Sequence, residues 1–267
     1  MIEHPTKPKQ RLRIWQQNTN RSLEAQLDLL HSLTPSRYSI AAIQEPHIDF
    51  LGNSRATPHW YTVYPPNHCD NPKATRSLLL ISKNLTTTNT WTQIPINSPD
   101  ITAIRLDSNL RPIYIYNIYN DGMHPRNLKS LEVYLHTLTN THPETRNAKM
   151  IWVGDFNRHH PLWDEDRNLH LFTSSNLDAA QPLLNLLAAN NMRMAHPKGI
   201  PTLEAMNTKN YTRPDNIFCL SELLGAFISC NTEHEMRPLR TDHLPIISVL
   251  DTELPSSMPS ARPTSKR

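Results

Sequence analysis

The chain has 267 residues, 37% hydrophobic and 19% charged, which is typical of a globular protein with a sizeable core. Its formal net charge of +3 permits an anionic partner without requiring one. Apolar runs fall short of the ~18 residues of a membrane span, and residues 1–10 lack the apolar core of a signal peptide. With three cysteines that show no metal-like spacing, we expect an intracellular protein, nuclear or cytoplasmic, with reduced thiols.

The first third of the chain is predicted to be rich in short buried strands. Apolar runs that end in polar or turn-forming residues predict four strands: Leu12–Gln16, Ser39–Gln44, Trp60–Tyr64 and Ser77–Ser82. Between the first two strands, leucines at helical spacing predict a helix over Arg21–Leu33, with Asn20 or Ser22 as its N-cap.

The remainder alternates strands with two clear helices. Leucines on one stripe predict helices over Pro125–Leu138 and Asn176–Asn190. Further strands are expected at Ile101–Leu106, Pro112–Tyr119, Met150–Val153, Asn216–Leu220, Ala226–Cys230 and Leu244–Leu250. The first two of these strands form a pair joined by a turn at Asp107–Asn109.

These elements predict one mixed-sheet α/β domain over residues 11–251. Residues 1–10 are polar and carry two prolines, so we expect a flexible N-terminal arm. Residues 252–267 are rich in proline and serine, and we expect a disordered tail or a linker to a longer polyprotein.

Oxygen-bearing side chains stand at one end of six of the predicted strands. The residues are Asn18 and Asn20, Glu45, Tyr119 with Asn120 and Asp121, Asp155 and Asn157, Asp215, and Asp242 with His243. If these ends converge, they form an oxygen-rich pocket that contains one histidine. Asp155 and Asn157 are two residues apart, so on extended backbone both side chains would leave the same face.

Such a pocket suits a hard cation, because carboxylates and amides favour Mg²⁺ or Mn²⁺. Its chemistry would be the hydrolysis of a phosphate ester, with arginines near the strand ends as phosphate contacts. These arginines are Arg21, Arg158, Arg213 and Arg240. His159, His160 and His170 could hold zinc with Asp164, but no HExxH or paired-cysteine motif supports that alternative.

Each strand-end group also has a structural interpretation. Gly154, Asp155 and Asn157 are common turn formers, so that segment could be a plain turn. Asn18 and Asn20 could simply cap the following helix. A lone Asp-His pair, such as Asp242 with His243, is more often structural than catalytic.

The motifs QNTN (17–20), IQEP (43–46), NIYND (117–121), VGDFNRHHPLWD (153–164), TRPDNIF (212–218) and TDHLPI (241–246) occur in this order. Together they resemble the endonuclease/exonuclease/phosphatase superfamily, and within it the apurinic/apyrimidinic-endonuclease-like domain of non-LTR retrotransposons. The resemblance runs from about Leu12 to Leu250, and its most specific part is GDFN followed by HHPLW.

The resemblance implies a four-layer α/β sandwich, with two mixed sheets face to face and helices outside. It also implies a Mg²⁺-dependent phosphodiesterase, with Mn²⁺ as an alternative cation. The implied metal site comprises Asn18 and Glu45, with Asn20 and Asp242 close by. The implied catalytic residues are Asp155 and Asn157 for the attacking water, Tyr119 and His243 for the phosphate or leaving oxygen, and Asp215 to orient His243. His160, Arg158, Arg21 and Asn120 are expected to contact the substrate.

The implied function is a DNA endonuclease that nicks one strand and leaves a 3′-hydroxyl for a reverse transcriptase of the same polyprotein. Alternatives on the same fold are a phosphatase, an abasic-site repair endonuclease, or an inactive transposon remnant. The chain departs from the resemblance at Gly122, where asparagine is frequent, at Leu203 in place of tryptophan, and in Thr212–Asp215, where a Ser-x-Ile-Asp type is usual. These departures affect fine substrate contacts more than the chemistry.

Overall fold

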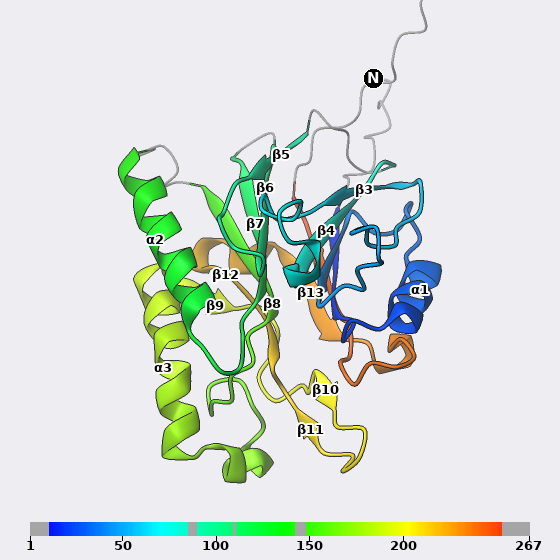
Figure 1. Ribbon diagram of the computed structural model, residues 1–267. Helices are drawn as coiled ribbons and strands as arrows, with labels where there is room; N and C mark the ends of the chain where they lie inside the picture. The colour runs from blue at the N-terminus through cyan, green and yellow to red at the C-terminus, as the bar shows by residue number, and fades with distance from the viewer. Residues whose placement is uncertain (1–10, 85–89, 109–110, 142–147, 253–267) are drawn as a thin grey trace, which may run out of the picture.

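The computed structural model describes residues 11–84, 90–108, 111–141 and 148–252 (Figure 1). The expected arm at 1–10, most of the expected tail and one residue of the turn at Asp107–Asn109 lie outside the described residues. Two six-stranded sheets form the centre of the protein (Figure 1).

The first sheet has the order β13-β14-β1-β2-β4-β3. Its strands are β1 (Leu12–Asn18), β2 (Ile40–Gln44), β3 (Trp60–Val63), β4 (Ser77–Ser82), β13 (Phe227–Thr232) and β14 (Ile246–Leu250). β1 and β2 are parallel, whereas β14 and β4 run antiparallel to them.

The second sheet has the order β5-β6-β7-β8-β12-β9. Its strands are β5 (Trp91–Ile94), β6 (Ile101–Leu106), β7 (Ile113–Tyr119), β8 (Lys149–Asp155), β9 (Met192–Met194) and β12 (Asp215–Leu220). β7 and β8 are parallel, and β12 runs antiparallel to β8. A separate two-stranded ribbon, β10 (Leu203–Glu204) with β11 (Tyr211–Thr212), projects beyond one end of the sheets (Figure 1).

Helices cover the outer faces of both sheets. α1 (Leu23–Ser32) lies over the first sheet, while α2 (Arg126–Thr141) and α3 (Ser174–Ala189) lie over the second (Figure 1). Ser22 is the N-cap of α1, since its hydroxyl accepts the Ala25 N–H at 3.1 Å. Short 3₁₀ helices occur at Pro72–Ala74, Asp166–Leu171, Ser221–Ala226 and His234–Met236.

Three apolar clusters separate these layers. The cluster between the sheets is aliphatic and includes Ile14, Ile40, Ile115 and Ile151, because β-branched side chains pack well on pleated surfaces. The other two clusters fill the spaces under α1 and under α2 with α3, and they carry the large aromatic residues such as Trp15 and Trp152. This layering confirms the predicted four-layer sandwich.

The predicted long strands are confirmed, but the sequence missed short ones at the periphery. β5, β9, β10 and β11 have two to four residues each, too few for a clear period-two pattern. β8 also continues through Gly154 to Asp155, two residues beyond the predicted end. None of the described helices is long and apolar enough to cross a membrane.

The strand directions bring the expected polar groups to one edge. β1 and β2 end together because they are parallel, as do β7 and β8. Asp215 opens β12 directly opposite Asp155, while β14 begins opposite Gln16. This shared edge lies at the bottom of Figure 1, on the side of the β10–β11 ribbon.

Candidate active site

Asp155 stands at the end of β8 with its carboxylate buried, only 1% exposed. One carboxylate oxygen accepts the side-chain amide of Asn18 from β1 at 2.8 Å. The other accepts the backbone N–H of Asn157 at 3.0 Å. Donors from both sheets therefore fix this carboxylate.

A second carboxylate, Asp215, holds His243. The Nδ1 of His243 lies 2.8 Å from Oδ2 of Asp215, and the Nε2 of Gln16 donates to Oδ1 of Asp215 at 2.9 Å. With Nδ1 committed to Asp215, the other ring nitrogen of His243 faces Asp155 and Asp242, each at 3.9 Å. The predicted pairing of Asp215 with His243 is therefore present in the structure.

Burial and neighbouring charge perturb both ionisable groups. Burial, reinforced by the charge of Asp215, raises the pKa of Asp155 to about 7, although His243 opposes the rise. Burial would lower the pKa of His243, but the carboxylates of Asp215, Asp155 and Asp242 outweigh it and raise that pKa to about 10. At neutral pH the site thus holds an imidazolium beside a carboxyl group that can exchange a proton.

The oxygen donors expected for a metal lie beside this pair. Glu45 follows β2, its side chain is 17% exposed, and Oε1 lies 3.6 Å from the Arg21 guanidinium. The Oδ1 of Asn18 accepts the Asn20 N–H at 2.8 Å, and the Asn20 amide donates to Asp242 at 3.3 Å. Carboxylate and amide oxygens are the donors that hard divalent cations prefer, so this set fits Mg²⁺ or Mn²⁺.

Two groupings could hold the cation. Among the described residues, ligand atoms of Asp155, Asp215 and His243 lie within 4.8 Å of one another. The 2.8 Å hydrogen bond between His243 and Asp215 already uses two of these atoms, and the oxygens of Glu45 and its neighbours form the other grouping. Within the described ranges, His159, His160 and His170 form no such cluster with ligand atoms close enough to share a zinc ion.

Tyr119 lies at the end of β7, where the charges of Glu45 and Asp155 act on its phenol. Burial, together with the charges of Glu45 and Asp155, raises the pKa of its phenol well above the ordinary value, so the phenol stays neutral and can donate. Arg76 lies over the Tyr119 ring, 4.6 Å from the centroid, and its Nε donates to Asp100 at 2.7 Å. Arg76 was not singled out from the sequence.

The side chains of four predicted site residues hydrogen-bond to main-chain carbonyls or pack against a neighbouring ring. Asn157 has a φ of 49° and its side chain donates to the Asn120 carbonyl, so it does not share the face of Asp155 as extended backbone would require. Asn120 is buried and donates to the Phe156 carbonyl at 2.7 Å. Arg158 is 4% exposed and donates four of its five N–H groups to main-chain carbonyls, so its guanidinium is held inside the protein. His160 packs against the Trp163 ring at 5.2 Å.

A buried polar chain behind the site escaped the sequence analysis. Gln16 donates to Gln44 at 2.8 Å, Gln44 donates to Asn117, and Asn117 donates to the carbonyls of Ile43 and Leu78 at 2.9 and 2.8 Å. Together with the bond from Gln16 to Asp215, the chain joins the Asp215 carboxylate to both sheets. The available signal was an amide within or at the end of each of three largely apolar strands.

The β10–β11 ribbon closes one side of the site. Leu203 forms an isolated antiparallel bridge with His243, and the Leu244 N–H donates to the Thr202 carbonyl at 2.7 Å. Arg213, which precedes β12, is 1% exposed and donates to carbonyls of Trp163 and His196. It therefore anchors the backbone that leads to Asp215.

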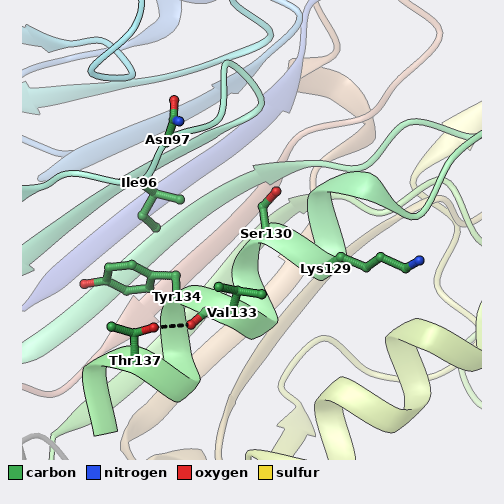
Figure 2. A pocket seen from close by; sticks show the side chains of 7 residues that line it. All are labelled: Ile96, Asn97, Lys129, Ser130, Val133, Tyr134 and Thr137. Carbon is green, nitrogen blue, oxygen red and sulfur yellow. Dashed lines mark hydrogen bonds between the residues drawn. The ribbon is translucent and has the colours of Figure 1, made fainter. Parts of the chain in front are cut away.

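A hollow of about 440 Å³ lies elsewhere, along α2. Figure 2 shows its lining, with the ring of Tyr134 and the hydrogen bond from Thr137 to the Val133 carbonyl. The lining residues are Ile96, Asn97, Lys129, Ser130, Val133, Tyr134 and Thr137. None of them belongs to the strand-end site.

Comparison with solved structures shows the same fold in several nucleases. The endonuclease domain of TRAS1, a telomere-specific non-LTR retrotransposon, superposes with a TM-score of 0.68 at 15% identity, covering 90% of this chain and 98% of that one. The AP endonuclease LMAP from Leishmania major gives 0.70 at 13% identity, covering 91% and 88%. An AP endonuclease from Archaeoglobus fulgidus gives 0.64 at 18%, covering 90% and 99%.

No curated protein matches the sequence. A family model described as endonuclease-reverse transcriptase matches residues 113–247, half of the chain, and spans Tyr119, Asp155, Asp215 and His243. The predicted superfamily resemblance is confirmed: the chain belongs to the endonuclease-reverse transcriptase family.

Proposed function

We propose that this chain is a divalent-metal-dependent DNA endonuclease that nicks one strand and leaves a 3′-hydroxyl. The observation that carries the proposal is the juxtaposition of Asp155 with the Asp215–His243 pair at the strand-end edge. Hydrolysis of a phosphodiester needs a group that accepts a proton and a group that donates one. The buried carboxyl group of Asp155 and the buried imidazolium of His243 can take these two roles.

Mg²⁺, held by Glu45 and Asn18 with Asn20 and Asp242 close by, would supply Lewis-acid polarisation of the phosphate. Arg21, paired with Glu45 at 3.6 Å, adds a cation at the rim, since its side chain is 54% exposed. Arg158 and Asn120 are not included, because both side chains are buried and donate to backbone carbonyls.

The chain's own residues supply the proton transfers. Asp155, with a pKa near neutrality, takes a proton from the attacking water as the oxygen–phosphorus bond forms. His243, held by Asp215, donates to a phosphoryl oxygen whose charge increases. The bond to O3′ breaks, the phosphate stays on the 5′ end of the other product, and O3′ takes a proton from solvent. Tyr119 donates its phenolic hydrogen to the same phosphate.

The test is nicking of supercoiled plasmid with Mg²⁺. We expect Asp155→Ala and His243→Ala each to lower the rate by about 10²–10⁴-fold, the contribution of a positioned acid or base. Asp178→Ala, on the exposed face of α3, is the matched control and should nick like the parent. Parent-like nicking by both site variants would refute the assignment.

The same preparations decide between substrates and partners. A parent that leaves plasmid intact but cuts an abasic duplex, or removes a terminal phosphate, would replace the proposal by one of those activities. Extension of the nick by a reverse transcriptase without prior end repair would establish the 3′-hydroxyl and support priming by the cut strand. Chelation with EDTA should abolish nicking, and added Mg²⁺ should restore it.

A further inference from the structure

The loop that follows Glu45 displays two large apolar side chains to solvent. Phe50 is 89% exposed and Leu51 is 70% exposed, side by side at the tip of residues 47–54. We call these residues the apolar loop. A scattered surface leucine needs no explanation, but an adjacent phenylalanine and leucine on one tip form a compact apolar projection.

The tip is held rigidly by its own hydrogen bonds. One oxygen of Asp49 accepts the N–H groups of Leu51 and Asn53, each at 2.9 Å. The Asp49 N–H donates to the Asn53 carbonyl at 2.9 Å, and Gly52 takes a φ of +82° that closes the turn. The two apolar side chains therefore stand on a preorganised platform.

The base of the apolar loop is fixed to neighbouring segments. His68 bridges it, with Nε2 2.8 Å from the Gly52 carbonyl and Nδ1 2.7 Å from the Thr75 hydroxyl. The His68 ring stacks on Tyr64 at 3.9 Å, and the Lys73 ammonium donates to the Ile48 carbonyl at 2.6 Å. Such bracing of an exposed tip reduces the entropy lost when it binds a partner.

The bracing also connects the apolar loop to the active site. Thr75, which holds His68, immediately precedes Arg76, the residue that lies over the Tyr119 ring. The Arg76 carbonyl accepts the Glu45 N–H at 2.9 Å. The apolar loop therefore begins two residues after the proposed metal ligand, and the segment that braces the loop is hydrogen-bonded to the backbone of that ligand.

Cationic side chains flank the tip. Arg21 and Arg55 have side chains 54% and 52% exposed, and Lys73 is exposed as well. The acidic groups nearby already have partners. Asp49 accepts two backbone N–H groups and pairs with Arg55 at 3.9 Å. Glu45 pairs with Arg21 and is a proposed ligand of the cation. In duplex DNA, stacked bases lie between two phosphate backbones. Apolar side chains at the tip could insert between the bases, while the cations beside the tip contact the phosphates.

We propose that the apolar loop is a wedge that inserts Phe50 and Leu51 into the base stack of duplex DNA beside the cut. Unstacking by apolar side chains kinks a duplex and exposes its backbone, which would bring the scissile phosphate to the strand-end site. The inference rests on the proposed function, because it takes DNA as the substrate of that site.

The test first maps where the parent nicks a duplex. A duplex with 2-aminopurine beside that position is then mixed with the Asp155→Ala variant, which we expect to bind DNA but to cut it at least about a hundredfold more slowly. We expect fluorescence to rise on binding, and Phe50→Ala with Leu51→Ala in the same background to remove the rise. In the active background the double variant should nick about ten- to a hundredfold more slowly, the loss expected for stacking of this kind.

Two variants serve as controls. Ile228→Ala removes a half-exposed apolar residue of β13 and should leave both readouts at parental values. Phe50→Trp keeps a stacking ring and should retain both readouts. Because Phe50 and Leu51 contribute little to the core, the alanine variants should also unfold at the parental temperature.

The outcomes separate the two proposals. Parental nicking and fluorescence in the double variant, with an active parent, would overturn the wedge and leave the nuclease standing. A double variant with unchanged DNA readouts but altered sedimentation would reassign the tip to protein contacts. A parent that neither binds nor nicks DNA would refute the nuclease proposal first, and the wedge with it.

Discussion

Gly154 gives the sharpest test of how the fold positions Asp155. It lies in β8 opposite Ile118 of β7, with a φ of +151° that side-chain-bearing residues rarely adopt. A Cβ placed there would stand 1.9 Å from the Ile118 carbonyl oxygen, far inside the 3.0 Å that real contacts respect. Gly154→Ala therefore forces the end of β8 away from β7 by about 1 Å.

That displacement acts on the next residue. A 1 Å misplacement of a reacting group costs about 10²-fold in rate, so we expect Gly154→Ala to lower nicking by about 10²-fold or more. The strained backbone and the overpacked strand pair should lower the free energy of unfolding by about 3 kcal/mol. Both effects come from one methyl group that touches no substrate.

Urea denaturation and plasmid nicking, measured on the same preparation, check this prediction. Gly225→Ala is the matched control, because a Cβ there meets no atom within 4 Å and should change neither quantity. A Gly154→Ala variant that keeps parental nicking would show that Asp155 does not depend on this close strand contact, and the argument for its positioning would fail.

Three further changes test the surroundings of the site. Burial, with a contribution from Arg213, lowers the pKa of His196 to about 3. Below pH 6.5 the unfolded chain therefore binds a proton at His196 that the folded chain does not, and the free energy of unfolding decreases as the pH is lowered. Urea titrations of the parent should show about 2 kcal/mol of this loss at pH 5, and His196→Gln should lack it; equal losses would refute the assignment. Gln16→Leu removes a donor to Asp215 and should lower both the nicking rate and, by about 1–3 kcal/mol, the free energy of unfolding; unchanged nicking would make the buried amide chain purely structural. Arg158→Ala should destabilise the fold by about 1–3 kcal/mol yet leave the salt dependence of DNA binding unchanged, whereas a phosphate contact would reduce that slope.

Much of the fold follows from local patterns. β4 and β6 were predicted with their observed bounds, because β4 is an apolar run between two serines and β6 is a mostly apolar segment between Asp100 and Asp107. Neighbouring strand order did not follow, since the pairing of β14 with β1 joins residues more than two hundred positions apart. The ordered motifs supplied that information through the resemblance they carry.

The side-chain roles were less predictable than the positions. Arg158 stands next to a motif residue, and only the three-dimensional structure shows that carbonyls of three segments enclose its guanidinium. The roles of Gln16, Gln44 and Asn117 do not follow from the sequence, because each belongs to a largely apolar predicted strand. Burying an amide is costly unless partners are provided, and only the three-dimensional structure shows those partners.

The turn interpretation of Gly154–Asn157 describes its backbone, and it does not compete with the role proposed for Asp155. Asn157 adopts a left-handed φ of 49°, as a turn residue would, and its N–H then points back to the Asp155 carboxylate at 3.0 Å. An extended chain would instead have carried Asn157 onward beside Asp155. The turn is thus the means by which β8 supplies a backbone donor to its own terminal carboxylate, and turn-forming residues are what such a segment requires.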